Sequence, residues 1–190
     1  MQPILKISLI ALFAFSFAAA ASAQERDDVI AQAPGSFSLN GHIYHKHLRD
    51  AVPPAMGYVT DWENLFTDAQ EAHLDSLLAA FETKTTIQVA VVTIDSAMSN
   101  DAGFDSVTLK IADAWGVGQK GKDNGLVIGI SNGLHIMRIQ TGNGLVQQLP
   151  DSETQKIVEQ HFLPSFEKGA YYEGTLDGLE ALMTKLGGSN

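Results

Sequence analysis

The chain has 190 residues, a formal net charge of −10 and no cysteine. This length suits one domain with its own hydrophobic core. The missing cysteine excludes disulfide bonds, thiol catalysis and thiolate metal sites. The acidic balance argues against nucleic acid, which requires a basic face, and against docking on anionic lipid. It remains compatible with binding a cation.

The first 23 residues have the pattern of a secretory signal peptide. Lys6 precedes a short apolar run, and Ala21-Ser22-Ala23 follows that run, just before Gln24. The apolar run is shorter than the ~20 residues that a bilayer-spanning helix needs. We therefore expect cleavage after Ala23 and a periplasmic or secreted product with no membrane anchor. An uncleaved anchor is the alternative interpretation.

Residues 24–57 are expected to form a flexible linker, because glycine, proline, serine and asparagine recur without a sustained hydrophobic period. Three histidines, His42, His45 and His47, lie close together there. A metal-binding tract is one interpretation. A solvated linker with incidental histidines is favoured, because no acidic or cysteine partner stands beside them.

A folded domain is expected over residues 58–188. Thr67 and Gln70 have the spacing of a capping box before a helix. The apolar, β-branched run 85–94 predicts a strand that is covered on both faces. Residues 104–115 then predict a helix that ends at Gly116.

The second half of the domain begins with a predicted hairpin. Its strands are residues 125–130 and 134–140, and Ser131-Asn132-Gly133 forms the turn. Asp151 opens a further helix, which Pro164 should kink or end, and a last helix stops at Gly187-Gly188. This order of elements predicts an α/β protein, a three-layer α/β/α sandwich with a small mixed central sheet.

The glycines after the 104–115 helix match two nucleotide-binding patterns. Gly116, Gly118 and Gly121 fit G-x-G-x-x-G, and residues 116–122 fit the first seven positions of a P-loop. Both motifs must follow a strand and open a helix, whereas here a helix precedes and a strand follows. Asp123 also stands where a P-loop needs serine or threonine. We therefore expect no nucleotide, and we expect these glycines to end a helix and turn the chain.

The predicted hairpin returns residues 140–144 to the sheet edge where Lys122, Asp123 and Asn124 precede the first strand. Asp151 should lie nearby. Carboxylate, amide and carbonyl oxygens are the ligands that calcium takes. Asp123, Asn124 and Asp151 are therefore the candidate metal ligands, with calcium as the candidate ion.

The same edge allows a second interpretation, in which basic side chains hold a phosphate. Lys122, Asp123 and Arg138 are then the candidate catalytic residues. A third interpretation is purely local, because Asp-Asn-Gly is a common turn sequence and Asp151 could cap its helix.

From Tyr58 onward the chain resembles the TPM-domain family. The resemblance rests on Trp-Gly-x-Gly followed by Lys-x-Asn-Gly, and on Arg-Ile before a Gly-x-Gly-Leu loop. The similar segments are YVTDWENLFT (58–67), IQVAVVTI (87–94), ADAWGVGQKGKDNGLVIGI (112–130), MRIQTGNGL (137–145), LPD (149–151) and FLPSFEKGAYYEGTLDGL (162–179).

The resemblance implies an α/β/α sandwich, secretion and, in some relatives, calcium binding or acid phosphatase activity on simple phosphate esters. Gln140 and Val146 stand where similar domains often carry glutamate, which weakens both implied activities here. Asp61 matches a family aspartate, but the predicted topology puts it away from the Asp123 edge.

Two functions follow. The first is a non-enzymatic accessory or binding module of the cell envelope, with an envelope protein as partner and calcium as a candidate ligand. The alternative is a metal-assisted acid phosphatase that acts on phosphate monoesters. The sequence has neither a G-x-S-x-G elbow nor an H-E-x-x-H motif, which favours the first.

Overall fold

A computed structural model of the chain describes residues 36–39, 42–45 and 52–187. The predicted signal peptide and His47 lie outside the described residues. Within the expected linker, β1 (Ser36–Leu39) and β2 (His42–His45) pair as an antiparallel hairpin. This hairpin is not among the predicted elements, and it places His42 and His45 in one strand.

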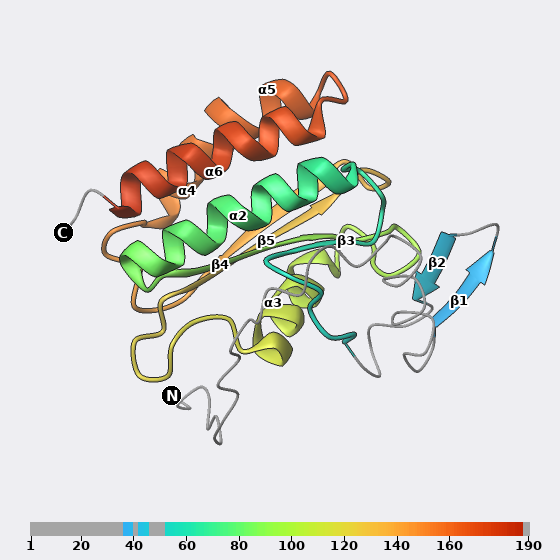
Figure 1. Ribbon diagram of the computed structural model, residues 1–190. Helices are drawn as coiled ribbons and strands as arrows, with labels where there is room; N and C mark the ends of the chain where they lie inside the picture. Colours follow the sequence, from blue (N-terminus) through green and yellow to red (C-terminus); the bar gives the residue numbers. More distant parts are fainter. Residues whose placement is uncertain (1–35, 40–41, 46–51, 188–190) are drawn as a thin grey trace.

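The domain is built on a four-stranded mixed sheet (Figure 1). The strands are β3 (Val59–Asp61), β4 (Gln88–Thr93), β5 (Gly125–Ser131) and β6 (Ile136–Thr141), in that spatial order. The first three strands are parallel, and β6 runs antiparallel to β5. The structure confirms the predicted hairpin and adds the short strand β3, which the sequence analysis missed.

Helices cover both faces of this sheet. α2 (Asp68–Thr85) begins at the predicted capping box, in which the side chain of Thr67 accepts from the backbone N–H of Gln70. α3 (Phe104–Trp115) lies on the opposite face (Figure 1) and has the predicted bounds. Gly116 ends α3 with a φ of 62°. This left-handed conformation suits glycine at a helix end, as the sequence predicted.

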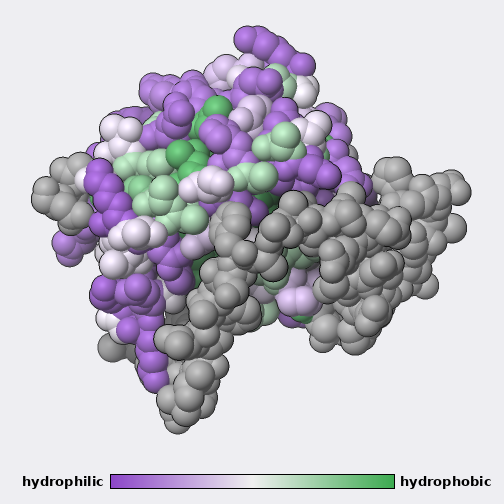
Figure 2. All heavy atoms as spheres, viewed as in Figure 1, coloured by the Kyte–Doolittle hydropathy of each residue, from purple (hydrophilic) through white to green (hydrophobic). Residues whose placement is uncertain are grey.

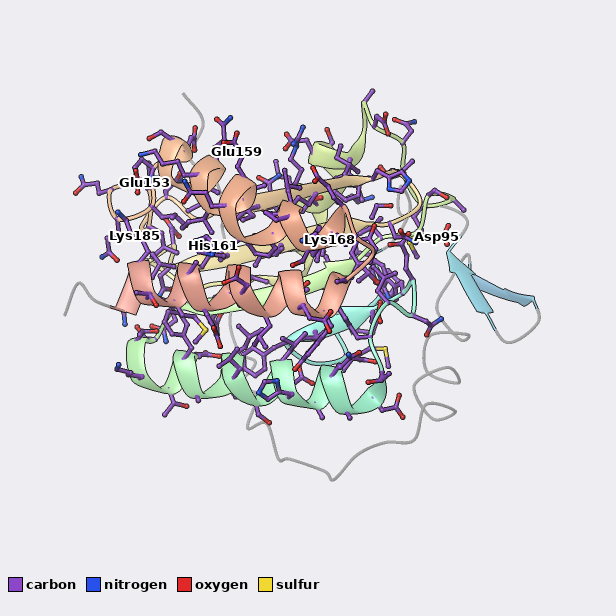
Figure 3. The ribbon with its side chains drawn as sticks, turned by 90° about the horizontal axis from the view of Figure 1, so that it is seen from above. Asp95, Glu153, Glu159, His161, Lys168 and Lys185 are labelled. Atoms are coloured by element: carbon purple, nitrogen blue, oxygen red, sulfur yellow. The ribbon has the colours of Figure 1, made fainter. Side chains whose placement is uncertain are left out.

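The C-terminal helices join α2 on its face of the sheet. They are α4 (Asp151–Ile157), the π-helical turn η1 (Val158–Phe162), α5 (Leu163–Phe166) and α6 (Tyr171–Gly187). The π turn directly precedes Pro164, where the sequence predicts a kink. Seen from above, α4 and α6 lie side by side, and Glu153 and Lys185 point toward each other with 3.3 Å between the carboxylate and Nζ (Figure 3).

Two hydrophobic cores hold the layers together. The larger core lies between the sheet and the layer of α2 and α6, and the smaller lies between the sheet and α3. Side chains of β5 alternate between them, because neighbouring residues of a strand point to opposite faces. Leu126 and Ile128 enter the larger core and Val127 the smaller. This arrangement confirms the predicted three-layer α/β/α sandwich.

Figure 2 shows one face of the described part, which is mostly hydrophilic with a few hydrophobic areas. Among the residues that the structure describes, no helix is both long enough and apolar enough to span a membrane.

Candidate functional site

The β5–β6 hairpin brings two loops together at the amino edge of the sheet, the edge where the parallel strands begin. The backbone N–H of Gly142 donates to the carbonyl of Gly125 at 2.8 Å, and that of Gly144 donates to the carbonyl of Asp123 at 3.0 Å. A Cβ atom at Gly142 or Gly144 would overlap carbonyl oxygens of the facing loop. Glycine is therefore required for this close approach, and the predicted convergence of residues 141–144 on Asp123 is confirmed.

A cavity of about 170 Å³ opens at this edge, between α3 and the paired ends of β5 and β6. Two carboxylates, Asp113 and Asp123, contribute to its lining, and none of the described lining residues is a lysine, arginine or histidine. The remaining lining residues are Leu109, Ala112, Gly116, Val117, Gly125, Val127, Gln140, Thr141, Gly142 and Asn143. The lining is therefore anionic, with amide, hydroxyl and apolar groups beside the carboxylates.

Both carboxylates of the cavity are exposed. Within the part of the chain that the structure describes, neither side chain makes a hydrogen bond or an ion pair. Asp123 has a φ of 49°, in the left-handed region that non-glycine residues rarely adopt. Asp113, in the last turn of α3, was not among the predicted site residues. Its signal in the sequence is the short connection from the end of α3 to β5, which keeps that turn near Asp123.

The two basic residues proposed to hold a phosphate do not line the cavity. Lys122 Nζ lies 3.3 Å from the hydroxyl of Thr86. Arg138 Nε lies 3.5 Å from the carboxylate of Asp105 on α3, and Gln140 Nε2 donates to the same carboxylate at 3.1 Å. Both basic side chains therefore contact groups outside the cavity lining.

The other two candidate metal ligands also lie outside the cavity lining. Asn124 is buried and uses both ends of its amide within the protein. Its Oδ1 accepts from the N–H of Gln119 at 2.8 Å, and its Nδ2 donates to the carbonyl of Thr86 at 2.6 Å. These hydrogen bonds of Asn124 link the loop before β5 to the end of α2. Asp151 is the exposed first residue of α4.

The opposite edge, where the parallel strands end, holds two further carboxylates. Asp61 accepts from the hydroxyl of Thr93 at 2.5 Å and from the N–H of Phe66 at 2.7 Å. Burial raises the pKa of Asp61, although these hydrogen bonds oppose the shift. Asp61 was expected to lie away from the Asp123 edge, and the strand pairing confirms this.

Glu63 follows Asp61 and closes the β5–β6 turn. Its carboxylate accepts from the N–H of Asn132 at 2.8 Å and from that of Gly133 at 3.0 Å. Burial is the main reason that the pKa of Glu63 is raised, and the negative charges of Asp95 and Asp61 add to it. The hydroxyl of Tyr171 donates to the side chain of Asn132 at 2.7 Å, so this edge is linked to α6 as well.

The cavity fits a calcium ion only in part. Calcium takes 6–8 oxygen ligands. Asp113 and Asp123 supply carboxylate oxygens, and Thr141 and Asn143 carry further side-chain oxygens among the lining residues. Over the described residues, no group of three or more histidine, cysteine, aspartate or glutamate side chains could hold a metal ion. Backbone carbonyls of the lining or water would have to supply the remaining ligands of an ion held here.

Comparisons with known proteins agree with this fold. A family model described as the TPM domain matches residues 59–185. The N-terminal domain of a protein from P. gingivalis is similar, with a TM-score of 0.64 and 34% sequence identity over 75% of this chain and 87% of that one. No curated protein matches the chain.

Two more distant structures show the same fold. The BA42 protein of the psychrophilic bacterium Bizionia argentinensis has a TM-score of 0.57 and 16% identity, covering 66% of this chain and 84% of that one. The N-terminal domain of the cg2496 protein from Corynebacterium glutamicum has a TM-score of 0.52 and 14% identity, covering 71% of this chain and 83% of that one.

Proposed function

Since the chain belongs to the TPM-domain family, we propose that it is a secreted or periplasmic accessory module that binds a protein partner of the cell envelope. The cavity at the amino edge is its binding site. The signal-peptide pattern of residues 1–23 supports the location. The single observation that carries the binding role is an open cavity whose two carboxylates have no partner among the described residues.

The same lining argues against unassisted chemistry on a phosphate ester. A phosphate monoester carries negative charge, and it would face Asp113 and Asp123 with no cationic side chain among the described lining residues. Like charges this close repel. Lys122 and Arg138, the groups that could offset them, contact Thr86 and Asp105 instead. Binding without turnover is therefore the better-supported function.

Calcium binding is the first part of this proposal to test. Asp113 and Asp123 would hold the ion, and thermal melts in calcium and in chelator would detect it. A ligand that binds only the folded state raises the melting temperature. At a ligand concentration of 100 times the Kd, the free energy of unfolding rises by about 2.7 kcal/mol. We expect the rise in the wild-type chain and its loss in the Asp113→Asn/Asp123→Asn variant. Asp151→Asn serves as the control and should retain the rise.

Partner binding is tested by capture from an envelope extract on the immobilised chain. The Asp113→Asn/Asp123→Asn variant should lose the captured protein, whereas Asp151→Asn should retain it. Equal capture by the wild-type chain and both variants would show that the cavity carboxylates do not bind the partner.

A metal-assisted acid phosphatase is the second candidate. The observation that favours it is the pair of carboxylates without a partner among the described residues, because a metal held there would supply a positive charge that the described lining residues do not carry. Hydrolysis of p-nitrophenyl phosphate, from acid to neutral pH with and without calcium, tests this candidate. Turnover that disappears in Asp123→Asn would establish it and overturn the non-enzymatic proposal, and no turnover in any condition would reject it.

A further inference from the structure

The cavity is amphipathic. Leu109, Ala112, Val117 and Val127 give it an apolar wall, and the two carboxylates lie within the same lining. Leu109 is 49% exposed, which is unusual for a large apolar side chain in this domain. Asp113 follows it one helical turn along α3. An occupant that matches this lining has an apolar stem and a positively charged head.

The size of the cavity favours such an occupant over a bare ion. A cavity of about 170 Å³ has room for several water molecules. A single ion between the carboxylates would leave the apolar wall in contact with water. A side chain with several methylene groups would cover that wall and release the water.

We propose that the cavity receives a lysine or arginine side chain of the protein partner, a proposal that rests on the binding function inferred above. The ammonium or guanidinium group interacts with Asp113 and Asp123, and the aliphatic stem packs along Leu109 and Val117. Charge-assisted hydrogen bonds to carboxylates are stronger than neutral ones. No basic residue stands among the described lining residues, so a cation from the partner would match this negative charge.

The arrangement of nearby charges also supports a basic side chain as the ligand. Asp105, one turn before Leu109 on α3, is already engaged by Arg138 at 3.5 Å and by Gln140. That pair shows how a long basic side chain lies against this helix. Asp113, one turn after Leu109, has the same chemistry, but it has no such partner among the described residues.

The test is an NMR titration of the ¹⁵N-labelled full chain with Nα-acetyl-lysine amide. Nα-acetyl-norleucine amide is the matched probe, since it has a similar stem without the charge. We expect the lysine probe to shift the amide signals of Asp113, Val117 and Asn143, with a Kd of about 1 mM or weaker for so small a ligand. Added salt should weaken the response, and the norleucine probe should give little.

Variants separate a cavity effect from a general charge effect. Asp113→Asn and Asp123→Asn should each weaken lysine binding about tenfold, because each removes one charged partner of the probe. Asp101→Asn changes an exposed aspartate outside the lining and should leave binding unchanged. The ¹⁵N spectra of all three variants also report whether each is folded.

Four outcomes would overturn the inference. Equal responses to the lysine and norleucine probes would show that charge plays no part. Unchanged lysine binding in both cavity variants would place the probe elsewhere. Chemical-shift changes with calcium, without any response to the lysine probe, would assign the cavity to a metal ion. Partner capture that needs the carboxylates, without any response to the lysine probe, would reject this inference and leave the proposed function standing.

Discussion

The two edges of the parallel strands use their carboxylates in opposite ways. Where the strands end, Asp61 and Glu63 are half-buried and accept hydrogen bonds from neighbouring segments of the chain. Where the strands begin, Asp113 and Asp123 are exposed, line a cavity and have no partner among the described residues. The first pair holds the fold together, and the second pair is free to bind a ligand.

This contrast reverses the usual position of a site in an open α/β sheet. Ligands of such sheets generally bind outside the carboxyl ends of the strands. Here Glu63 fills that position by binding the backbone of the β5–β6 turn. The antiparallel strand β6 returns the chain to the other edge, where its loop and the end of α3 build the cavity. The antiparallel strand β6 thus contributes to an open cavity at the amino edge.

The largest effect on stability is expected at the edge where the parallel strands end, which we call the closed edge because Asp61 and Glu63 bind neighbouring segments there. Asp61→Ala should lower the free energy of unfolding by about 3 kcal/mol, because the N–H of Phe66 and the hydroxyl of Thr93 lose their acceptor in a partly buried place. Urea unfolding measures this loss. Asp61→Asn keeps one oxygen as an acceptor and should lose less. Equal stability of Asp61→Ala and the wild type would show that this edge does not hold the fold.

A smaller loss of stability is expected where the two loops meet at the amino edge, which we call the open edge because the cavity lies there. The added methyl group of Gly142→Ala would overlap the carbonyl oxygen of Asp123. Overpacking of this kind costs about 2 kcal/mol, and it should also distort the cavity and weaken ligand binding. Gly187→Ala is the matched control, because its methyl group would meet the ring of Phe81 at an ordinary 3.5 Å. Equal melting temperatures for both variants would contradict the close approach of the loops.

The pH dependence of stability should come from the closed edge. The pKa values of Asp61 and Glu63 are raised in the folded state, mainly by burial. Protonation therefore favours folding, so their contribution to stability should grow as the pH falls through the raised pKa values. It should be complete below the unfolded value of about 4. Melting temperatures between pH 7 and pH 4.5 would measure this gain.

A double variant isolates that contribution. Asp61→Asn/Glu63→Gln removes both titrating groups and should flatten the profile over the same pH range. Glu153 provides a contrast, because hydrogen bonds and charge from Lys156 and Lys185 lower its pKa. Its contribution is lost only as the pH falls below the usual carboxyl range. An unchanged slope in the double variant would assign the pH dependence to other groups.

The smallest effect on stability is expected for the cavity carboxylates. Asp113→Asn and Asp123→Asn should each change the free energy of unfolding by less than about 0.5 kcal/mol, as exposed and unpartnered side chains do. The same variants should lose binding of a basic ligand. A large loss of stability in either one would mean that the open edge also holds the fold.

Much of the fold could be predicted because its signals are local. The capping box at Thr67 and the glycine end of α3 lie within a few residues of the boundaries that they set. Strand β3 has only three residues, too few to show a hydrophobic period, and its partner β4 lies about thirty residues further along the chain. Its pairing depends on tertiary contacts, which is why the sequence did not reveal it.

At the candidate site, the sequence predicted the approach of the loops but not the directions of the side chains. Chain reversal at the hairpin was enough to bring residues 141–144 to Asp123. The directions of side chains were not predictable, because they depend on partners distant in sequence, such as Thr86 for Lys122 and Asp105 for Arg138. The role of Asp113 as a lining residue likewise depends on how α3 packs against β5 and β6.

The left-handed backbone at Asp123 has a consequence for how the domain could evolve. A residue with a side chain is disfavoured in this conformation by roughly 1–2 kcal/mol, and glycine is not. Replacing Asp123 with glycine would therefore relieve local strain while removing a carboxylate from the cavity. Selection for stability would favour glycine at this position, whereas selection for ligand affinity would favour aspartate.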